Sequence, residues 1–212
     1  MTELSTFQYE LLYNTFSFGI ATFAAATIFF WLGRSQVSSA YKTAISITGL
    51  VTFIAFYHYW RIFESFGDAY TLTDGMVEAT GASFNDAYRY VDWLLTVPLL
   101  LIELILVMKL TQSETVSKSF NLGLAAAIMV ILGYPGEISM EAGTRWTYWV
   151  LAMIPFVYIV YQLYVGLGEA ISKQPDNVKG LVATARNVTV LSWCFYPVVF
   201  IFPMIGIEGS NA

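Results

Sequence analysis

Hydrophobic residues occur along this chain in long, nearly unbroken stretches that are separated by short polar segments. Six stretches are close to the ~20 apolar residues that a transmembrane helix needs, and they cover residues 13–33, 42–63, 87–110, 119–135, 146–168 and 181–205. Apolar residues run continuously within each stretch, whereas a membrane-barrel strand alternates apolar and polar positions. The pattern therefore predicts an all-α, multi-pass membrane protein.

The polar segments between these stretches predict where helices end. The fourth stretch is the shortest, and we expect its helix to stop at Tyr134-Pro135-Gly136 because proline and glycine end helices. The longest polar segment, residues 64–85, contains Asp74-Gly75 between two short extended runs, which is typical of a β-hairpin. No internal repeat interrupts the chain, so residues 1–212 are interpreted as a single transmembrane helical domain.

Composition supports the membrane interpretation and excludes several function classes. The chain is 57% hydrophobic and 12% charged, against about 45–50% and about 25% in soluble domains. A single cysteine, Cys194, excludes a disulfide framework and any multi-cysteine metal site, and the lone His58 leaves no zinc motif. The net charge of −5 argues against nucleic acid as a partner.

The basic residues predict that the N-terminus lies outside the cell. Alternate loops carry most of them, namely Arg34, Lys42, Lys109, Lys118, Lys173, Lys179 and Arg186. The opposite loops carry Arg61 and Arg145 and most of the acidic residues. Glu3 and Glu10 precede the first apolar stretch, where a signal peptide would be basic, so we expect that stretch to be a retained span.

The third stretch contains three ionisable residues, Arg89, Asp92 and Glu103, with Thr96 between the two acids. Ionisable residues inside a membrane span are costly and are usually functional. In a helix, Asp92 and Glu103 would lie within ~20° of one face and ~16 Å apart along the axis, about half of the ~30 Å hydrocarbon core. This spacing favours a proton relay. The alternatives are a structural Asp92–Arg89 ion pair and an interfacial Glu103 near Lys109.

His58 and a group of aromatic and small residues are further candidates. His58 lies in the second stretch at a depth similar to that of Asp92, where an imidazole would tune the proton affinity of the carboxylate. A packed, hydrogen-bonded histidine is the alternative. Rings and a glycine gap predict a slot for a long, flat, apolar ligand, and the residues concerned are Trp93, Met129, Gly133, Trp149, Trp193, Tyr196 and Pro197. Their alternative position is a lipid-facing aromatic belt.

Three motifs resemble those of microbial (type 1) rhodopsins, and of the proteorhodopsin and xanthorhodopsin-like proton pumps in particular. They are Arg89-Tyr90-Val91-Asp92-Trp93-Leu94-Leu95-Thr96-Val97-Pro98-Leu99-Leu100 followed by Glu103, Gly133-Tyr134-Pro135-Gly136-Glu137, and Trp193-Cys194-Phe195-Tyr196-Pro197. The resemblance implies a seven-transmembrane-helix bundle around all-trans retinal, of which this chain holds six helices. It also implies a light-driven ion transporter rather than an enzyme, in a bacterial-type inner membrane and as a homo-oligomer.

The resemblance assigns a role to each candidate residue. Asp92 would be the counterion and the acceptor of the Schiff-base proton, and His58 its partner. Arg89 would help to pass protons outward, Thr96 would bridge by hydrogen bonding, and Glu103 would be the cytoplasmic proton donor. A photosensory rhodopsin, a sodium pump and a retinal-free membrane protein are the alternatives. A sensor has no need of the donor Glu103, and a sodium pump would carry Asn, Asp and Gln at the positions of Asp92, Thr96 and Glu103.

Two retinal-pocket residues carry further expectations from the resemblance. Leu100 occupies a position beside the polyene where an apolar residue accompanies green absorption. Trp149 occupies the position at which some xanthorhodopsin-like pumps have a glycine that opens a window for a carotenoid. We therefore expect a green-absorbing pigment without a carotenoid antenna.

The chain departs from the family in its lysines. The family attaches retinal to a lysine of the seventh helix, and the printed sequence stops at Ala212, where that helix would begin. The lysines present lie at span ends or in loops, at Lys42, Lys109, Lys118, Lys173 and Lys179. None is a plausible Schiff-base lysine, so we expect retinal on a lysine beyond Ala212 and interpret the sequence as incomplete.

Overall fold

The computed structural model describes residues 4–172 and 175–207. Within these residues, six helices are long and apolar enough to cross a membrane, as the hydrophobic pattern predicts. The chain divides into two compact units, one ending at Thr96 and the other beginning at Val97. Helix α3 (Ala87–Val107) contributes to both units, and each unit is described by itself.

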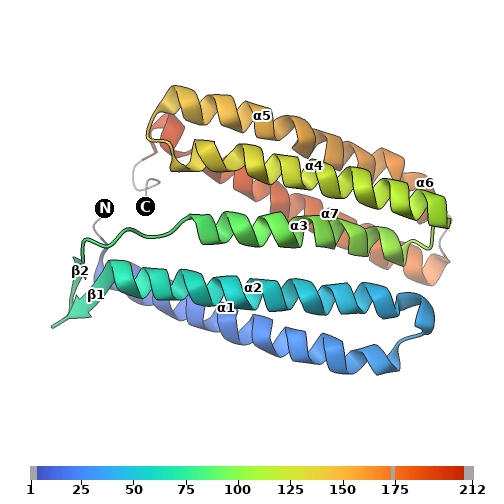
Figure 1. Cartoon of the computed structure of the whole chain (residues 1–212), viewed down its shortest axis with the longest axis horizontal. Coiled ribbons are helices and arrows are strands. Elements are labelled where there is room, and N and C mark those ends of the chain that lie inside the picture. Colours follow the sequence, from blue (N-terminus) through green and yellow to red (C-terminus); the bar gives the residue numbers. More distant parts are fainter. Residues whose placement is uncertain (1–3, 173–174, 208–212) are drawn as a thin grey trace. The chain divides into compact units, whose positions relative to one another are not determined.

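Unit 1 is a helical hairpin that carries a small sheet at one end (Figure 1). Its elements are α1 (Thr6–Gly33), two short 3-10 turns (η1, Arg34–Gln36; η2, Ser39–Tyr41), α2 (Lys42–Ala69), β1 (Tyr70–Thr73), β2 (Met76–Ala79) and the first part of α3. A capping box between Ser5 and Gln8 starts α1, so the helix begins seven residues before the predicted residue 13. Helices α1 and α2 pack along each other.

The predicted β-hairpin is present. Strands β1 and β2 pair antiparallel, with Leu72 opposite Val77. Asp74 and Gly75 form the turn with φ angles of 53° and 79°, which a two-residue primed turn requires and which Asp and Gly tolerate. The Thr6 hydroxyl donates a hydrogen bond of 2.8 Å to the carbonyl of Gly75, so the hairpin is held against the start of α1.

Unit 2 contains the rest of α3 and three long helices. Its further elements are α4 (Gln112–Ile138), α5 (Ala142–Tyr161), a π-helical turn (η3, Gln162–Gly166), α6 (Gly168–Ser172), α7 (Asp176–Phe200) and a 3-10 turn (η4, Pro203–Ile205). Helix α4 packs along α5, and α5 contacts α7. The predicted stop at Pro135 was wrong, because α4 continues through it to Ile138. Gly136 there lies against α5 and Phe200, and this packing holds the last turn.

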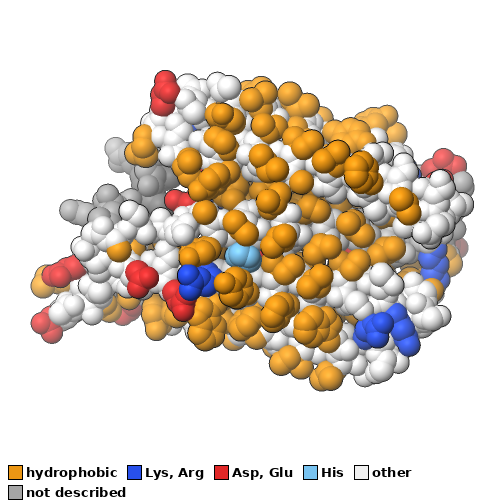
Figure 2. Space-filling model, in the orientation of Figure 1, with side chains coloured by type: hydrophobic (Ala, Val, Ile, Leu, Met, Phe, Trp, Pro, Cys, Tyr) orange, Lys and Arg blue, Asp and Glu red, His pale blue; other side chains and the backbone are white. Residues whose placement is uncertain are grey.

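Large apolar side chains are exposed along the helices, as Figure 2 shows. Phe18, Leu32 and Leu191 each expose more than 70% of their surface. Contiguous apolar surface on this scale is unusual in soluble proteins and marks contact with another apolar phase. The helices therefore belong to a multi-pass membrane protein, with lipid as the solvent of their outer faces.

Candidate functional site

The third helix carries a buried carboxylate. Asp92 is only 5% exposed, one turn after Tyr88 and one turn before Thr96. Thr96 is equally buried, and its hydroxyl donates a hydrogen bond of 2.8 Å to the backbone carbonyl of Asp92. The Thr96 hydroxyl thus contacts the main chain of Asp92, as is common for threonine in helices.

Asp92 and His58 each bury one polar atom that has no hydrogen-bond partner within the described part of the chain. These atoms are Asp92 Oδ1 and His58 Nδ1, and no hydrogen bond joins the two side chains among the residues that the structure describes. His58 lies in α2, is 7% exposed and meets the ring of Tyr57 edge-on, with centroids 5.2 Å apart. Buried polar groups in proteins are almost always satisfied, so both atoms indicate that a group such as a ligand or water completes the site.

Arg89 lies on the same helix but binds elsewhere. Its Nη2 donates to Asp86 Oδ1 at 3.1 Å, and both side chains are about 40% exposed. The guanidinium also lies 5.9 Å from the centroid of the Trp93 ring, and Trp93 in turn lies 5.2 Å from the ring of Tyr90. An Arg–Trp cation–π contact of this length orients the arginine along α3.

The remaining predicted site residues belong to unit 2. Leu100 and Glu103 lie on α3, and both are half-buried. Met129 and Gly133, also half-buried, lie one turn apart on α4. Of the three predicted α7 residues, Trp193 and Pro197 are half-buried and Tyr196 is 49% exposed.

Trp149 forms a direct link between α5 and α7. Its indole Nε1 donates a hydrogen bond of 3.0 Å to the carbonyl oxygen of Pro197. That carbonyl would normally accept from the amide of Ile201, but the amide bonds instead to Val198 and Val199 at the end of α7. The Pro197 carbonyl is thus available to Trp149 because of the helix end, which the sequence motif alone did not predict.

The described lysines lie at or near helix ends. Lys42 begins α2, Lys109 follows α3, and Lys179 is in the first turn of α7. Lys118, in the second turn of α4, donates to the carbonyl of Gly166 at 3.2 Å and so caps the π-helical turn. Lys173 lies outside the described residues.

The structure also contains a polar network that the sequence analysis missed. Arg61 Nη1 lies 2.6 Å from Glu64 Oε2, and its Nη2 donates to the Tyr88 hydroxyl at 2.8 Å. The guanidinium also lies 5.1 Å from the centroid of the Tyr88 ring. The sequence did contain a signal for this network. Tyr88 lies one helical turn before Asp92, and Arg61 lies one turn after His58.

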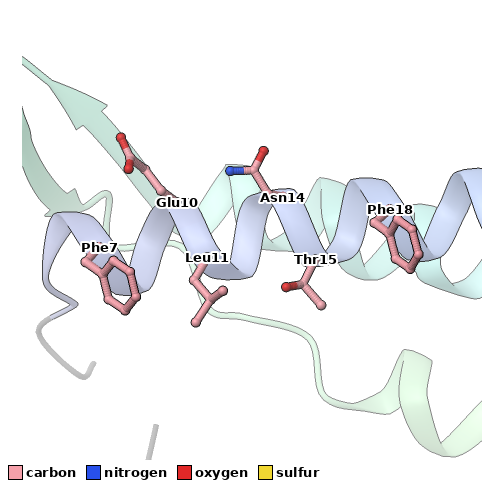
Figure 3. A pocket seen from close by; sticks show the side chains of 6 residues that line it. All are labelled: Phe7, Glu10, Leu11, Asn14, Thr15 and Phe18. Atoms are coloured by element: carbon pink, nitrogen blue, oxygen red, sulfur yellow. The ribbon is translucent and has the colours of Figure 1, made fainter.

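A hollow on the surface of unit 1 lies on α1 alone (Figure 3). It has a volume of about 380 Å³, and its lining side chains all come from one helix, namely Phe7, Glu10, Leu11, Asn14, Thr15 and Phe18. Phe7 and Phe18 are each more than 70% exposed. No second element encloses this surface among its lining residues, so it is an outer helix face and not part of the candidate site.

Comparison with known proteins decides the family. The sequence profile described as "Bacteriorhodopsin-like protein" matches residues 11–212. The chain belongs to the bacteriorhodopsin-like family. It is a microbial, type 1 rhodopsin.

Individual relatives agree with this assignment. The rhodopsin is 32% identical over 203 residues to the green-light absorbing proteorhodopsin of Gamma-proteobacterium EBAC31A08, covering 94% of this chain and 76% of that protein. Among solved structures it resembles xanthorhodopsin, which is described as a light-driven ion pump with dual chromophore. The two sequences are 47% identical and the structures superpose with a TM-score of 0.92, covering 96% of this chain and 82% of xanthorhodopsin. It also resembles thermophilic rhodopsin, with 46% identity and a TM-score of 0.93 over 99% and 84% of the respective chains.

Proposed function

We propose that this rhodopsin is a light-driven outward proton pump that uses all-trans retinal. The observation that carries the proposal is the buried Asp92, whose Oδ1 lacks a partner among the described residues, in a chain similar to proteorhodopsin and to the light-driven ion pump xanthorhodopsin. A buried carboxylate is stable as an anion only beside a positive charge. Retinal bound through a protonated imine is a cation of this kind, so the residues present fit the group.

Retinal, when bound, supplies light absorption and a positive charge whose proton is lost and regained. Asp92 accepts one proton at its carboxylate, and His58, with its unpaired Nδ1, is the group that orients and stabilises it. Glu103 returns one proton from the opposite end of α3. Thr96 fixes the backbone at Asp92 through its 2.8 Å hydrogen bond, and Arg89 is positioned to lead protons outward.

The remaining retinal contacts are proposed from the motifs of α3, α4, α5 and α7. The residues that would line the chromophore are Trp93, Leu100, Met129, Gly133, Trp149, Trp193, Tyr196 and Pro197. Their rings and the single glycine suit a flat polyene. The described lysines lie at or near helix ends, so we propose that the attachment lysine lies beyond Ala212, in a seventh helix.

Unit 1 supports an orientation with the hairpin end outside. In Figure 2, acidic side chains gather at the hairpin end of this unit, beside one group of basic side chains, and other basic side chains lie at its opposite end. The exposed acids at the hairpin end include Asp68, Asp74 and Glu78, whereas Arg34 and Lys42 lie at the α1–α2 connection. Cytoplasmic loops are enriched in Lys and Arg. The N-terminus would then be outside, in a bacterial-type inner membrane, and we expect homo-oligomers there.

The test uses cells that produce the protein and are supplied with all-trans retinal. We expect a visible absorption band in their membranes and a fall in external pH under illumination in both sodium and potassium media. A band without any pH change would instead support the photosensory alternative. A change that requires sodium would support a sodium pump, and the absence of a band would support a retinal-free protein. Each of these three results contradicts the proposal.

A further inference from the structure

Unit 1 contains a polar pocket at its hairpin end that the roles assigned above do not use. Its volume is about 590 Å³, and it is lined mainly by polar and charged side chains, among them Arg61, Glu64, Ser65, Asp68, Asn85 and Tyr88. Arg89, which is expected to lead protons outward, and its ion-pair partner Asp86 are not among the lining residues. The pocket is therefore a polar site separate from the Arg89–Asp86 pair.

One arginine organises the pocket. Arg61 donates from Nη1 to Glu64 and from Nη2 to the Tyr88 hydroxyl. The Trp60 indole donates to the other Glu64 oxygen at 2.9 Å, so both carboxylate oxygens have a fixed donor. The Glu64 side chain is 46% exposed, so its carboxylate is open to solvent. The pocket thus presents an oriented carboxylate to solvent.

The helical repeat connects this pocket to the buried acid. Tyr88 and Asp92 lie four residues apart on α3, on the same helix face and ~6 Å apart along the axis. His58 and Arg61 are related in the same way on α2, three residues apart. Because Tyr88 Oη is the acceptor in its bond with Arg61, its O–H hydrogen is left to donate to another group. Solvent exposure therefore increases along these polar side chains. Asp92 and His58 are 5% and 7% exposed, whereas Arg61 and Tyr88 line the open pocket.

We propose that Glu64 is the group through which the proton leaves unit 1, with Tyr88 as the relay that passes the proton to it and Arg61 as the positioning residue. The inference rests on the proposed outward pumping. The Asp92 carboxyl breaks its O–H bond, and one proton passes by way of the Tyr88 hydroxyl, which accepts a proton as it gives one up. The Glu64 carboxylate forms an O–H bond and then loses that proton to bulk water. One proton moves in total, and no electron is transferred.

The experiment compares two times in the full-length protein after a light flash. One is the protonation of Asp92, followed by its carboxylic C=O infrared band, and the other is the appearance of the proton in a pH-sensitive dye on the outer side. In Glu64→Gln we expect Asp92 protonation at the wild-type time and a delay of at least about tenfold in the dye signal, because a positioned proton carrier contributes factors of this size or more. Tyr88→Phe should delay the dye signal in the same way.

Two further variants control the result. Glu78→Gln removes another acid of the hairpin end, one that does not line the pocket, and should keep the wild-type dye timing. Glu64→Asp keeps a carboxylate and should restore the timing to within about twofold. Wild-type dye timing in Glu64→Gln would overturn the inference, as would an equal delay in Glu78→Gln. If Glu64→Gln fails to fold, Tyr88→Phe decides alone. A wild type without light-driven proton movement would contradict the proposed function instead.

Discussion

The indole Nε1 of Trp149 donates a 3.0 Å hydrogen bond to the carbonyl oxygen of Pro197, which ties α5 to α7 within unit 2. The Trp146 ring packs edge-on against the Trp149 ring, with centroids 5.8 Å apart. Two contacts therefore hold the Trp149 side chain in one orientation. A residue with this volume and these contacts differs in kind from the glycine that the xanthorhodopsin-like resemblance associates with a carotenoid window.

We predict from this relationship that hydroxylated carotenoids do not transfer excitation to retinal in the wild type. Trp149→Gly should open the position and add a carotenoid-shaped contribution to the action spectrum of pumping. Trp149→Phe is the matched control, because it keeps a ring but removes the N–H, and it should leave the spectrum unchanged. A carotenoid contribution in the wild type would contradict the blocked window.

Leu100 sets the second prediction, which concerns colour. An apolar side chain at this position does not preferentially stabilise positive charge near one end of the chromophore, so we expect green absorption. Leu100→Gln introduces an amide dipole and should shift the visible band to shorter wavelength, whereas Leu100→Met, similar in volume and still apolar, should leave it nearly in place. The absorption spectrum of the purified pigment measures both. A red shift in Leu100→Gln, or no shift, would argue against a position beside the polyene.

Glu103 gives a kinetic prediction. Glu103→Gln removes the proposed donor but keeps the shape of the side chain, so the light-induced loss of the chromophore proton should keep its rate. The return of that proton should slow by on the order of 10²-fold, the usual contribution of a positioned acid. Azide, a small proton carrier, should restore the return. Flash spectroscopy follows both steps, and an unchanged recovery in Glu103→Gln would remove Glu103 from the mechanism.

The packing of Gly136 gives a prediction for stability. A Cβ atom at this position would lie 2.9 Å from Tyr148 Cβ and 3.2 Å from Phe200 Cζ, so Gly136→Ala should destabilise unit 2 by about 1–3 kcal/mol, as overpacking does. Gly168→Ala is the control, since nothing lies within 4 Å of a Cβ there, and it should be neutral or slightly stabilising. Thermal unfolding followed by circular dichroism compares the two variants. Equal melting temperatures would show that the helices relax around the added methyl group.

The sequence predicted the local features of the fold more accurately than its tertiary contacts. Asp74-Gly75 predicted the hairpin because its turn depends on the φ angles of those two residues alone. The start of α1 at Thr6 was missed because the span was placed by hydrophobicity, whereas the helix begins at the Ser5–Gln8 capping box. The continuation of α4 beyond Pro135 depends on neighbours of Gly136 that are distant in the sequence, which no local rule contains.

The candidate site also contains residues that the sequence predicted and contacts that it did not. The third-helix motif pointed to Asp92 from residue type and position, and the structure buries it. The pairing of Arg61 with Tyr88 joins residues 27 apart, and the bond of Trp149 to Pro197 joins residues 48 apart. Side-chain partners at such separations are set by the packing of helices. They are therefore visible only once the fold is known.

The central claim is outward proton transport through Asp92, and the external pH of illuminated, intact cells tests it most directly. The cells produce either the wild type or Asp92→Asn, with retinal supplied to both. The account predicts that light acidifies the medium around wild-type cells, that a protonophore abolishes this change, and that Asp92→Asn cells show a pigment band without acidification. Acidification by Asp92→Asn cells at the wild-type rate, or alkalinisation by the wild type, would contradict the account.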